Sequence, residues 1–224
     1  MIPLVLASAS PARHATLKAA GIDALRLPAD VDEAAILHDA VRRDPALPPS
    51  AQVTVLARAK AEAVYAAAPP AALILGCDSM LELDGEVLGK PLGAADAARR
   101  IRQQSGRSAW LHTGHWLAGP AGGALLPTPA RSPGVPGAGE RAGVGAASST
   151  EVRFGELTDR EIEAYVATGE PLGVAGAFTI DGWGGPFIEG VVGDPHGVVG
   201  LSLPTLRHLL ARFGLTVMDL WRDL

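Results

Sequence analysis

The segment from Leu4 to Gly21 constrains the fold most tightly. The apolar run Leu4–Ala7 predicts a short buried strand. Small residues follow, and Ser10 stands at a helix N-cap position directly before Pro11, which suits the first helical position. Gly21 lies where such a helix is expected to end. The segment therefore predicts a strand, a small-residue loop and a helix in direct succession.

This arrangement is typical of phosphate-binding sites. Free N–H groups of the first helical turn and the positive end of the helix dipole point at one spot beside the loop. Ser8, Ser10 and Arg13 add hydrogen-bond donors there. The alternative is an ordinary strand–helix turn whose serines only cap the helix.

The composition indicates a folded protein with few classes of partner. The 224 residues are 48% hydrophobic and 19% charged, which allows one large domain or two small ones. The net charge is −5 without a block of Lys or Arg, so we expect no nucleic-acid partner. The stretch from Ser108 to Ala130 lacks charges but is broken by glycine and proline, so we expect no membrane association. The single cysteine, Cys77, and an N-terminus without a signal-peptide pattern favour a cytoplasmic location.

Strand-like and helix-like segments alternate along most of the chain. Strands are predicted over residues 73–77, 80–83, 86–88, 108–117, 151–154 and 186–192, and helices over 50–68, 94–104, 158–169 and 204–213. Ser50 is the expected cap of the first of these helices, and residues 30–33 are expected to form an acidic turn. This alternation predicts an α/β fold, a sheet flanked by helices.

The pattern stops between residues 118 and 149. Thirteen of these 32 residues are glycine or proline, and no apolar period survives. Because patterned sequence resumes on both sides, we expect a flexible insertion within a single domain spanning residues 1–224.

Four charged residues are candidates for chemistry on a bound phosphate. Asp78 follows a buried strand, where α/β proteins place ligands, and Glu33 lies in a loop that could fold over the same opening. Lys60 and Lys90 provide ammonium groups from two other segments. Carboxylates of this kind favour Mg²⁺ or Mn²⁺, and the set suits hydrolysis of a polyphosphate. Each residue alone has an ordinary alternative as a solvated charge or, for Asp78, a turn cap.

Eleven sequence blocks, in order, resemble one known family. They are Leu4–Arg13, Val31–Glu33, Ala57–Ala61, Leu75–Ser79, Leu83–Pro91, Gln104–Arg107, His112–Gly114, Glu161–Tyr165, Gly169–Leu172, Ala175–Phe178 and Val198–Leu201. The chain is similar to the Maf family of nucleoside triphosphate pyrophosphatases, from about Leu4 to Leu210 and without the 118–149 segment.

The resemblance implies an elongated, mixed and twisted sheet flanked by helices, with a deep substrate cleft as in the inosine triphosphate pyrophosphatases. It implies a homodimer that cleaves nucleoside triphosphates between the α and β phosphorus atoms with a divalent metal. By motif, Asp78 corresponds to the catalytic carboxylate, and Ser8, Ser10 and Arg13 to the phosphate-binding signature. Glu33, Lys60 and Lys90 match the remaining polar cleft residues: Asp78 and Glu33 would hold the metal, and the lysines would contact the phosphates.

Three departures fall at positions by which the family selects a base. Ala12 stands where the branch acting on dTTP and UTP has arginine, Ser79 where it has threonine, and Asp181 where it has glutamine. The branch acting on 7-methyl-GTP has other residues again. An ionised aspartate accepts hydrogen bonds but donates none, so Asp181 would read a different base edge from glutamine. We expect activity on nucleoside triphosphates, nonstandard or modified ones included, with an altered base preference.

Two other classes of function are alternatives for this sequence. A division-linked regulatory protein with a vestigial nucleotide pocket would bind nucleotides without turnover. A phosphotransferase is disfavoured because no Gly-x-x-x-x-Gly-Lys-Ser/Thr run occurs. The six histidines show no zinc-ligand spacing, so we expect them to be ordinary core or surface residues.

Overall fold

The computed structural model describes residues 1–120 and 141–222. Its strands are β1 (Leu4–Leu6), β2 (Ala24–Arg26), β3 (Leu73–Leu83), β4 (Glu86–Leu88), β5 (Ser108–Ala118), β6 (Gly143–Phe154) and β7 (Ile188–Val192). Its α-helices are α1 (Pro11–Ala19), α2 (Glu33–Arg43), α3 (Pro49–Ala63), α4 (Ala94–Gln104), α5 (Asp159–Ala167), α6 (Pro195–Val199) and α7 (Leu203–Arg212). Short 3₁₀ helices are η2 (Glu170–Gly173), η3 (Ala175–Ala177), η4 (Gly185–Phe187) and η5 (Val217–Leu220).

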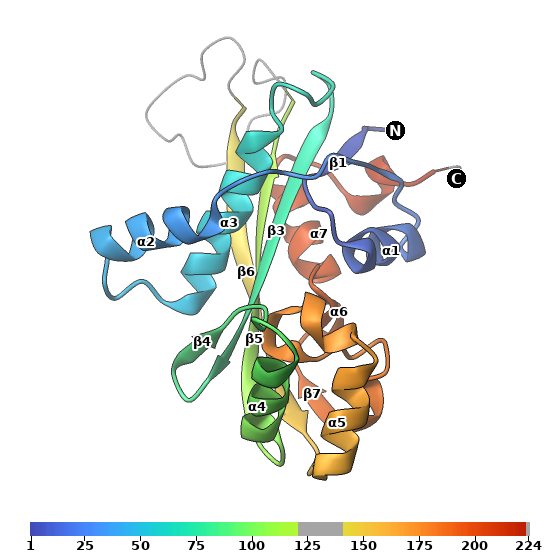
Figure 1. Cartoon of the computed structure of the whole chain (residues 1–224). Helices are drawn as coiled ribbons and strands as arrows, with labels where there is room; N and C mark the ends of the chain where they lie inside the picture. Colours follow the sequence, from blue (N-terminus) through green and yellow to red (C-terminus); the bar gives the residue numbers. More distant parts are fainter. Residues whose placement is uncertain (121–140, 223–224) are drawn as a thin grey trace.

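The strands form one mixed, seven-stranded sheet in the order β2-β1-β3-β5-β6-β7, with β4 also paired to β3. β1 runs parallel to β2 and β3, whereas all other pairs are antiparallel. Figure 1 shows that β3, β5 and β6 run the length of the molecule and join a half containing β1, α1 and α7 to a half containing α4, α5 and β7. The expected α/β architecture, with an elongated mixed sheet flanked by helices, is therefore confirmed.

The N-terminal segment folds as predicted. Ser10 caps α1 by accepting a hydrogen bond from the backbone N–H of Arg13, and Pro11 is the first helical residue. Leu4 and Leu6 of β1 lie in the largest apolar cluster together with Leu206 of α7. Burial of this cluster fixes the end of β1, and thereby the loop that leads into α1.

The expectation that Asp78 follows the end of a strand is wrong. β3 continues without a break from Leu73 to Leu83, so Asp78 lies in its middle. Along one edge of β3, pairing with β1 stops at Leu75 and pairing with β4 begins at Leu81, while β5 occupies the other edge. The gap between these two partners leaves that edge unpaired beside Asp78. The ligand position thus arises from a missing neighbour rather than from a strand end.

Three further boundaries differ from the sequence expectations. α3 begins at Pro49, with Pro48 at the N-cap position, so Ser50 does not cap it, and the helix ends at Ala63 rather than at the expected residue 68. The expected acidic turn is instead a helix start, because the side chain of Asp32 accepts a hydrogen bond from Ala35 and caps α2.

The third difference concerns the expected insertion at 118–149. β5 includes Ala118, and β6 begins at Gly143 and pairs with β5 throughout residues 143–153, because cross-strand pairing compensates for the low strand propensity of glycine. Residues 121–140, on which the prediction of flexibility mainly rested, lie outside the described part of the chain.

Candidate active site

A cavity of about 660 Å³ opens at the gap in the edge of β3. Its walls come from the β1–α1 loop, the start of α2, α3, β3 and the segments around residues 90, 175 and 200. All ten residues selected from the sequence line it: Ser8, Ser10, Ala12, Arg13, Glu33, Lys60, Asp78, Ser79, Lys90 and Asp181. The N-terminal turn and the β3 carboxylate therefore share one cavity.

The β1–α1 loop is ordered by its own serines. The hydroxyl of Ser8 accepts hydrogen bonds from the backbone N–H of Ser10 at 3.2 Å and from Arg13 Nη1 at 3.2 Å. Ser8 is buried, so these contacts fix the loop against the end of β1. The N-terminal end of α1 is thereby held toward the cavity, where its dipole favours an anion.

Arg13 links this loop to β3 and to the C-terminal part of the chain. Its Nε donates to the carbonyl of Gly200 at 2.8 Å and its Nη1 to the carbonyl of Cys77 at 2.8 Å. Its Nη2 donates to the hydroxyl of Ser79 at 3.0 Å. With the contact to Ser8, four hydrogen bonds engage the guanidinium within the protein. Arg13 therefore positions other groups and brings a positive charge to the cavity wall.

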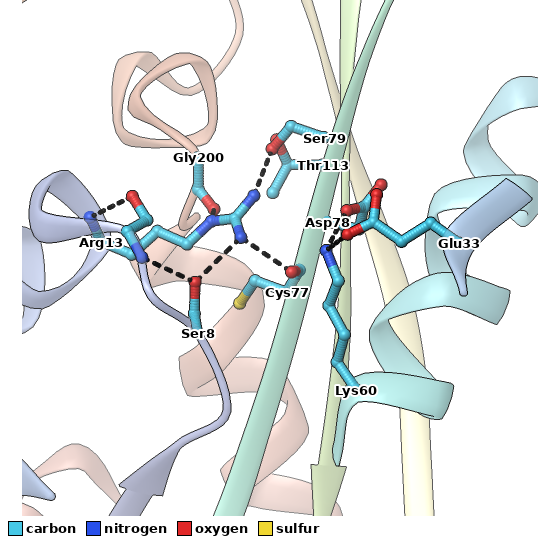
Figure 2. A network of polar contacts seen from close by, with 10 residues as sticks. Ser8, Arg13, Glu33, Lys60, Cys77, Asp78, Ser79, Thr113 and Gly200 are labelled. Carbon is cyan, nitrogen blue, oxygen red and sulfur yellow. Dashed lines mark hydrogen bonds and ion pairs between the residues drawn. The ribbon is translucent and has the colours of Figure 1, made fainter. Parts of the chain in front are cut away.

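Ser79 and Asp78 lie on opposite faces of β3, because successive side chains of a strand alternate. Figure 2 shows Arg13 and Ser79 on one side of the strand, and Lys60 and Glu33 on the other. The Ser79 hydroxyl also lies 2.9 Å from the Thr113 hydroxyl of β5. Because Ser79 and Asp78 both line the cavity at the unpaired edge of β3, the cavity contacts both faces of the sheet.

Lys60 joins the two carboxylates of the cavity. Its Nζ lies 2.5 Å from Asp78 Oδ1 and 2.8 Å from Glu33 Oε1, as Figure 2 shows. The Lys60 and Asp78 side chains are only 12% and 9% exposed, whereas that of Glu33 is 46% exposed. Burial raises the pKa of the Asp78 carboxyl above its ordinary value, and the positive charges of Lys60 and Arg13 oppose this effect.

Close packing of α3 on the sheet sets this geometry. A Cβ atom at Gly76 would lie 2.0 Å from the carbonyl oxygen of Ala57, and one at Gly114 would lie 2.3 Å from the carbonyl of Val53. The helix therefore rests directly on the backbone of β3 and β5. This contact brings Lys60, one turn beyond Ala57, to the level of Asp78 on the strand.

Lys90 enters the cavity from a loop that α4 supports. Arg100 Nη1 donates to the carbonyl of Gly89 at 2.7 Å, and the backbone N–H of Gly176 donates to the same carbonyl at 3.1 Å. Gln104, buried on α4, donates to the carbonyl of Gly176 at 2.6 Å. Sequence reasoning did not predict these supporting contacts, because the acceptors are backbone groups that only the tertiary fold brings near.

The carboxylates fit the divalent cation that the resemblance implies. Lys60 Nζ occupies the point between Asp78 Oδ1 and Glu33 Oε1, so a divalent cation would bind the other oxygen of each carboxylate. Hard carboxylate oxygens suit Mg²⁺ or Mn²⁺. Asp78 and Glu33 would be its protein ligands; among residues 1–120 and 141–222, no group of three or more His, Cys, Asp or Glu side chains gathers.

No described helix has both the length and the apolar character needed to cross a membrane.

His115 is fully buried, and its Nε2 accepts a hydrogen bond from the backbone N–H of Ser202 at 2.8 Å. Burial, followed by the charge of Arg13, lowers the pKa of His115 to about 4, so it is a neutral core residue at pH 7.

Fold and cavity together define an α/β protein with a polar cleft at an open sheet edge. The family model for "Maf-like protein" matches residues 3–213. The chain therefore belongs to the Maf-like family.

Curated relatives named nucleoside triphosphate pyrophosphatase cover nearly the whole chain. The protein of Salinispora tropica is 49% identical over 222 residues, which are 97% of this chain and 87% of the relative. That of Leifsonia xyli is 47% identical over 97% of this chain and 96% of the relative. That of Thermosynechococcus vestitus is 44% identical over 98% of both chains.

Proposed function

We propose that this protein hydrolyses nucleoside triphosphates between the α and β phosphorus atoms, giving the monophosphate and pyrophosphate. One observation carries the proposal: the helix N-terminus and the buried Asp78–Lys60 pair line the same cavity. The shared name of the relatives, nucleoside triphosphate pyrophosphatase, supports the general activity. The substrates include nonstandard or modified nucleotides, because the family's base-selecting positions are altered here.

The triphosphate is held by the positive part of the cavity. The N-terminal turn of α1, with Ser8 and Ser10, faces one group of phosphate oxygens, and Arg13 contributes charge from behind Ser8. Lys90 lies on the cavity wall and contacts the phosphates from the opposite element. Because charge stabilisation and positioning supply most of the catalysis in phosphate transfer, these groups lower the barrier without forming covalent bonds.

Asp78 is the general base. Its Oδ1 is bound to Lys60, and no donor among the described residues reaches Oδ2, which leaves that oxygen for a water molecule. The water oxygen bonds to the α phosphorus while its proton passes to Asp78. The bond from the α phosphorus to the bridging oxygen breaks, and pyrophosphate leaves with that oxygen. Burial of the carboxyl, which raises its pKa, increases its basicity for this step.

Asp78 and Glu33 would hold Mg²⁺ or Mn²⁺, which when bound neutralises phosphate charge. Lys60, placed between the two carboxylates, keeps both in position. We further propose a cytoplasmic homodimer that acts on free nucleotides, with no nucleic-acid or membrane partner.

A nucleotide panel with Mg²⁺ tests the proposal by the release of pyrophosphate. We expect turnover of at least one triphosphate, and a loss of about 100-fold or more in kcat for Asp78→Asn, in line with removal of a general base. Asp39→Asn is the matched control, since Asp39 lies half exposed on α2 outside the cavity lining. Nucleotide binding without pyrophosphate release from any triphosphate would refute the proposal and favour the division-linked regulatory protein.

A further inference from the structure

A second polar cluster lies on the sheet outside the cavity described above. His112 of β5 stands opposite Ser149 of β6 in the strand register. The Ser149 hydroxyl is 2.8 Å from His112 Nδ1, and Glu82 Oε2 of β3 is 2.8 Å from His112 Nε2. Met80, which pairs with His112, packs on α3, so the cluster faces the α3 side of the sheet. One imidazole thus connects a hydroxyl to a carboxylate across three strands.

The two contacts fix which ring nitrogen of His112 carries the proton. The carboxylate of Glu82 accepts hydrogen bonds, so Nε2–H is the donor toward it. Nδ1 is then the unprotonated nitrogen, and it accepts the hydrogen bond from the Ser149 hydroxyl. This is the order of nucleophile, base and orienting carboxylate in serine hydrolases, with the two ring nitrogens exchanged.

Burial differs among the three side chains in a way that suits catalysis. The His112 and Glu82 side chains are 10% and 27% exposed, whereas Ser149 is exposed. The imidazole is therefore held in place at both nitrogens, while the hydroxyl can be reached from outside. A base needs a fixed position and a nucleophile needs access to its substrate.

Ser149 lines a second cavity, of about 620 Å³, between α3 and β6. Ala51 and Val55 of α3, Ala147 of β6 and Trp116 of β5 give this cavity apolar surface. Among the described residues, none lines both this cavity and the one at Asp78. An apolar cavity with a nucleophilic hydroxyl in its wall suits a substrate with a short acyl chain.

The outer edge of β6 offers donors for a negatively charged oxygen. β5 occupies one edge of β6 throughout residues 143–153, but β7 pairs with the other edge only from Glu151 onward. Over residues 143–150, that outer edge has no strand partner among the described strands. Backbone N–H groups beside a nucleophile stabilise the oxyanion that forms when a carbonyl is attacked.

We propose that Ser149, His112 and Glu82 form a second catalytic site, which hydrolyses esters of short carboxylic acids. Ser149 Oγ bonds to the carbonyl carbon while its proton passes to His112 Nδ1. The bond from that carbon to the alkoxy oxygen then breaks, and the alcohol leaves with the proton from His112.

Water completes the reaction. Its oxygen bonds to the acyl carbon, and its proton passes to His112 Nδ1. The bond from the acyl carbon to Ser149 Oγ breaks, the carboxylic acid leaves, and Oγ regains a proton from His112. Glu82 is a positioning residue in both steps, because it holds the imidazole and stabilises the positive charge that the imidazole gains.

Labelling with a fluorophosphonate tests the nucleophile directly. The phosphorus of this probe bonds to an activated serine oxygen, and fluoride leaves together with the hydroxyl proton. Peptide mass spectrometry of the labelled full-length chain should locate the adduct on Ser149. Ser148→Ala is the matched control and should be labelled as the wild type is, because successive residues of a strand point to opposite faces. Absence of an adduct on Ser149 would overturn the proposal.

Turnover of p-nitrophenyl acetate and butyrate separates the roles of the three residues. Ser149→Ala and His112→Gln should each lower kcat/KM by about 100-fold or more. Glu82→Gln should lower kcat by about tenfold or more at an unchanged KM, because orientation of the base is lost and binding is not. Thermal melts report whether each variant folds; should His112→Gln not fold, Glu82→Gln tests the base through its partner. Wild-type turnover by Ser149→Ala, or an unchanged kcat for Glu82→Gln, would contradict the assignment.

Discussion

Removal of the Lys60 ammonium tests whether Lys60 and Asp78 are electrostatically coupled in the cavity. Lys60→Met keeps most of the side-chain volume but leaves Asp78, 9% exposed, without its 2.5 Å partner. Breaking one side of a buried ion pair typically costs about 3–5 kcal/mol in the free energy of unfolding. Glu33 contributes little to this loss because its side chain is 46% exposed and water can replace the lysine.

The loss should depend on pH in a defined direction. Without Lys60, the folded-state pKa of Asp78 rises further above its unfolded value, because burial is then opposed only by Arg13 among the charges that lower it. The folded variant therefore binds more protons than the unfolded chain above about pH 4, and its stability falls as pH rises through the folded pKa. The destabilisation relative to wild type should be larger at pH 8 than at pH 5.

Urea unfolding of four proteins measures the coupling: wild type, Lys60→Met, Asp78→Asn and the double variant. The double variant should recover about 2 kcal/mol or more relative to the sum of the single changes, because it removes the uncompensated charge. Additivity within about 0.5 kcal/mol, or a destabilisation that does not change with pH, would refute the claim that the pair is electrostatically coupled.

Three further outcomes are expected. For His115, the folded pKa of about 4 lies below the unfolded value of 6.5, so the unfolded chain binds more protons between these pH values. The free energy of unfolding, measured with urea, should fall by about 3 kcal/mol as pH drops from 6.5 to 4. The His115→Gln variant should not show this pH-dependent loss. Gly76→Ala should destabilise by about 1–3 kcal/mol in thermal melts, since its Cβ would meet a helix carbonyl at 2.0 Å, whereas Gly190→Ala, with open space, should not. Chelation with EDTA should abolish pyrophosphate release and added Mg²⁺ should restore it; equal rates with and without EDTA would argue against a metal at Asp78 and Glu33.

Local chemistry made the N-terminal turn predictable. Ser10 and Pro11 encode a helix start through contacts within four residues, so their roles followed from the sequence and are confirmed. The ten candidate residues all line one cavity. Local chemistry pointed to seven of them, and the resemblance to a family added Ala12, Ser79 and Asp181. Their separate catalytic roles stay predictions.

The features that could not be predicted from the sequence depend on contacts between distant parts of the chain or on a neighbouring proline. The mid-strand position of Asp78 depends on where β1 and β4 stop along β3, which no local pattern encodes. Glu170 stands in the block Gly169–Leu172, but its contacts could not be predicted because its donors lie nine to fourteen residues away in a glycine-rich loop without periodicity. Likewise, Ser50 resembles a helix cap by type, but Pro48 fixes the start of α3 earlier.

Hydrolysis in water enriched in oxygen-18 tests the central claim most directly. Wild-type protein, Mg²⁺ and an accepted triphosphate should place the heavy oxygen in the nucleoside monophosphate and none in pyrophosphate, and Asp78→Asn should give almost no labelled product. Label in pyrophosphate, or an Asp78→Asn variant that produces labelled monophosphate as fast as the wild type, would contradict attack at the α phosphorus by a water that Asp78 activates.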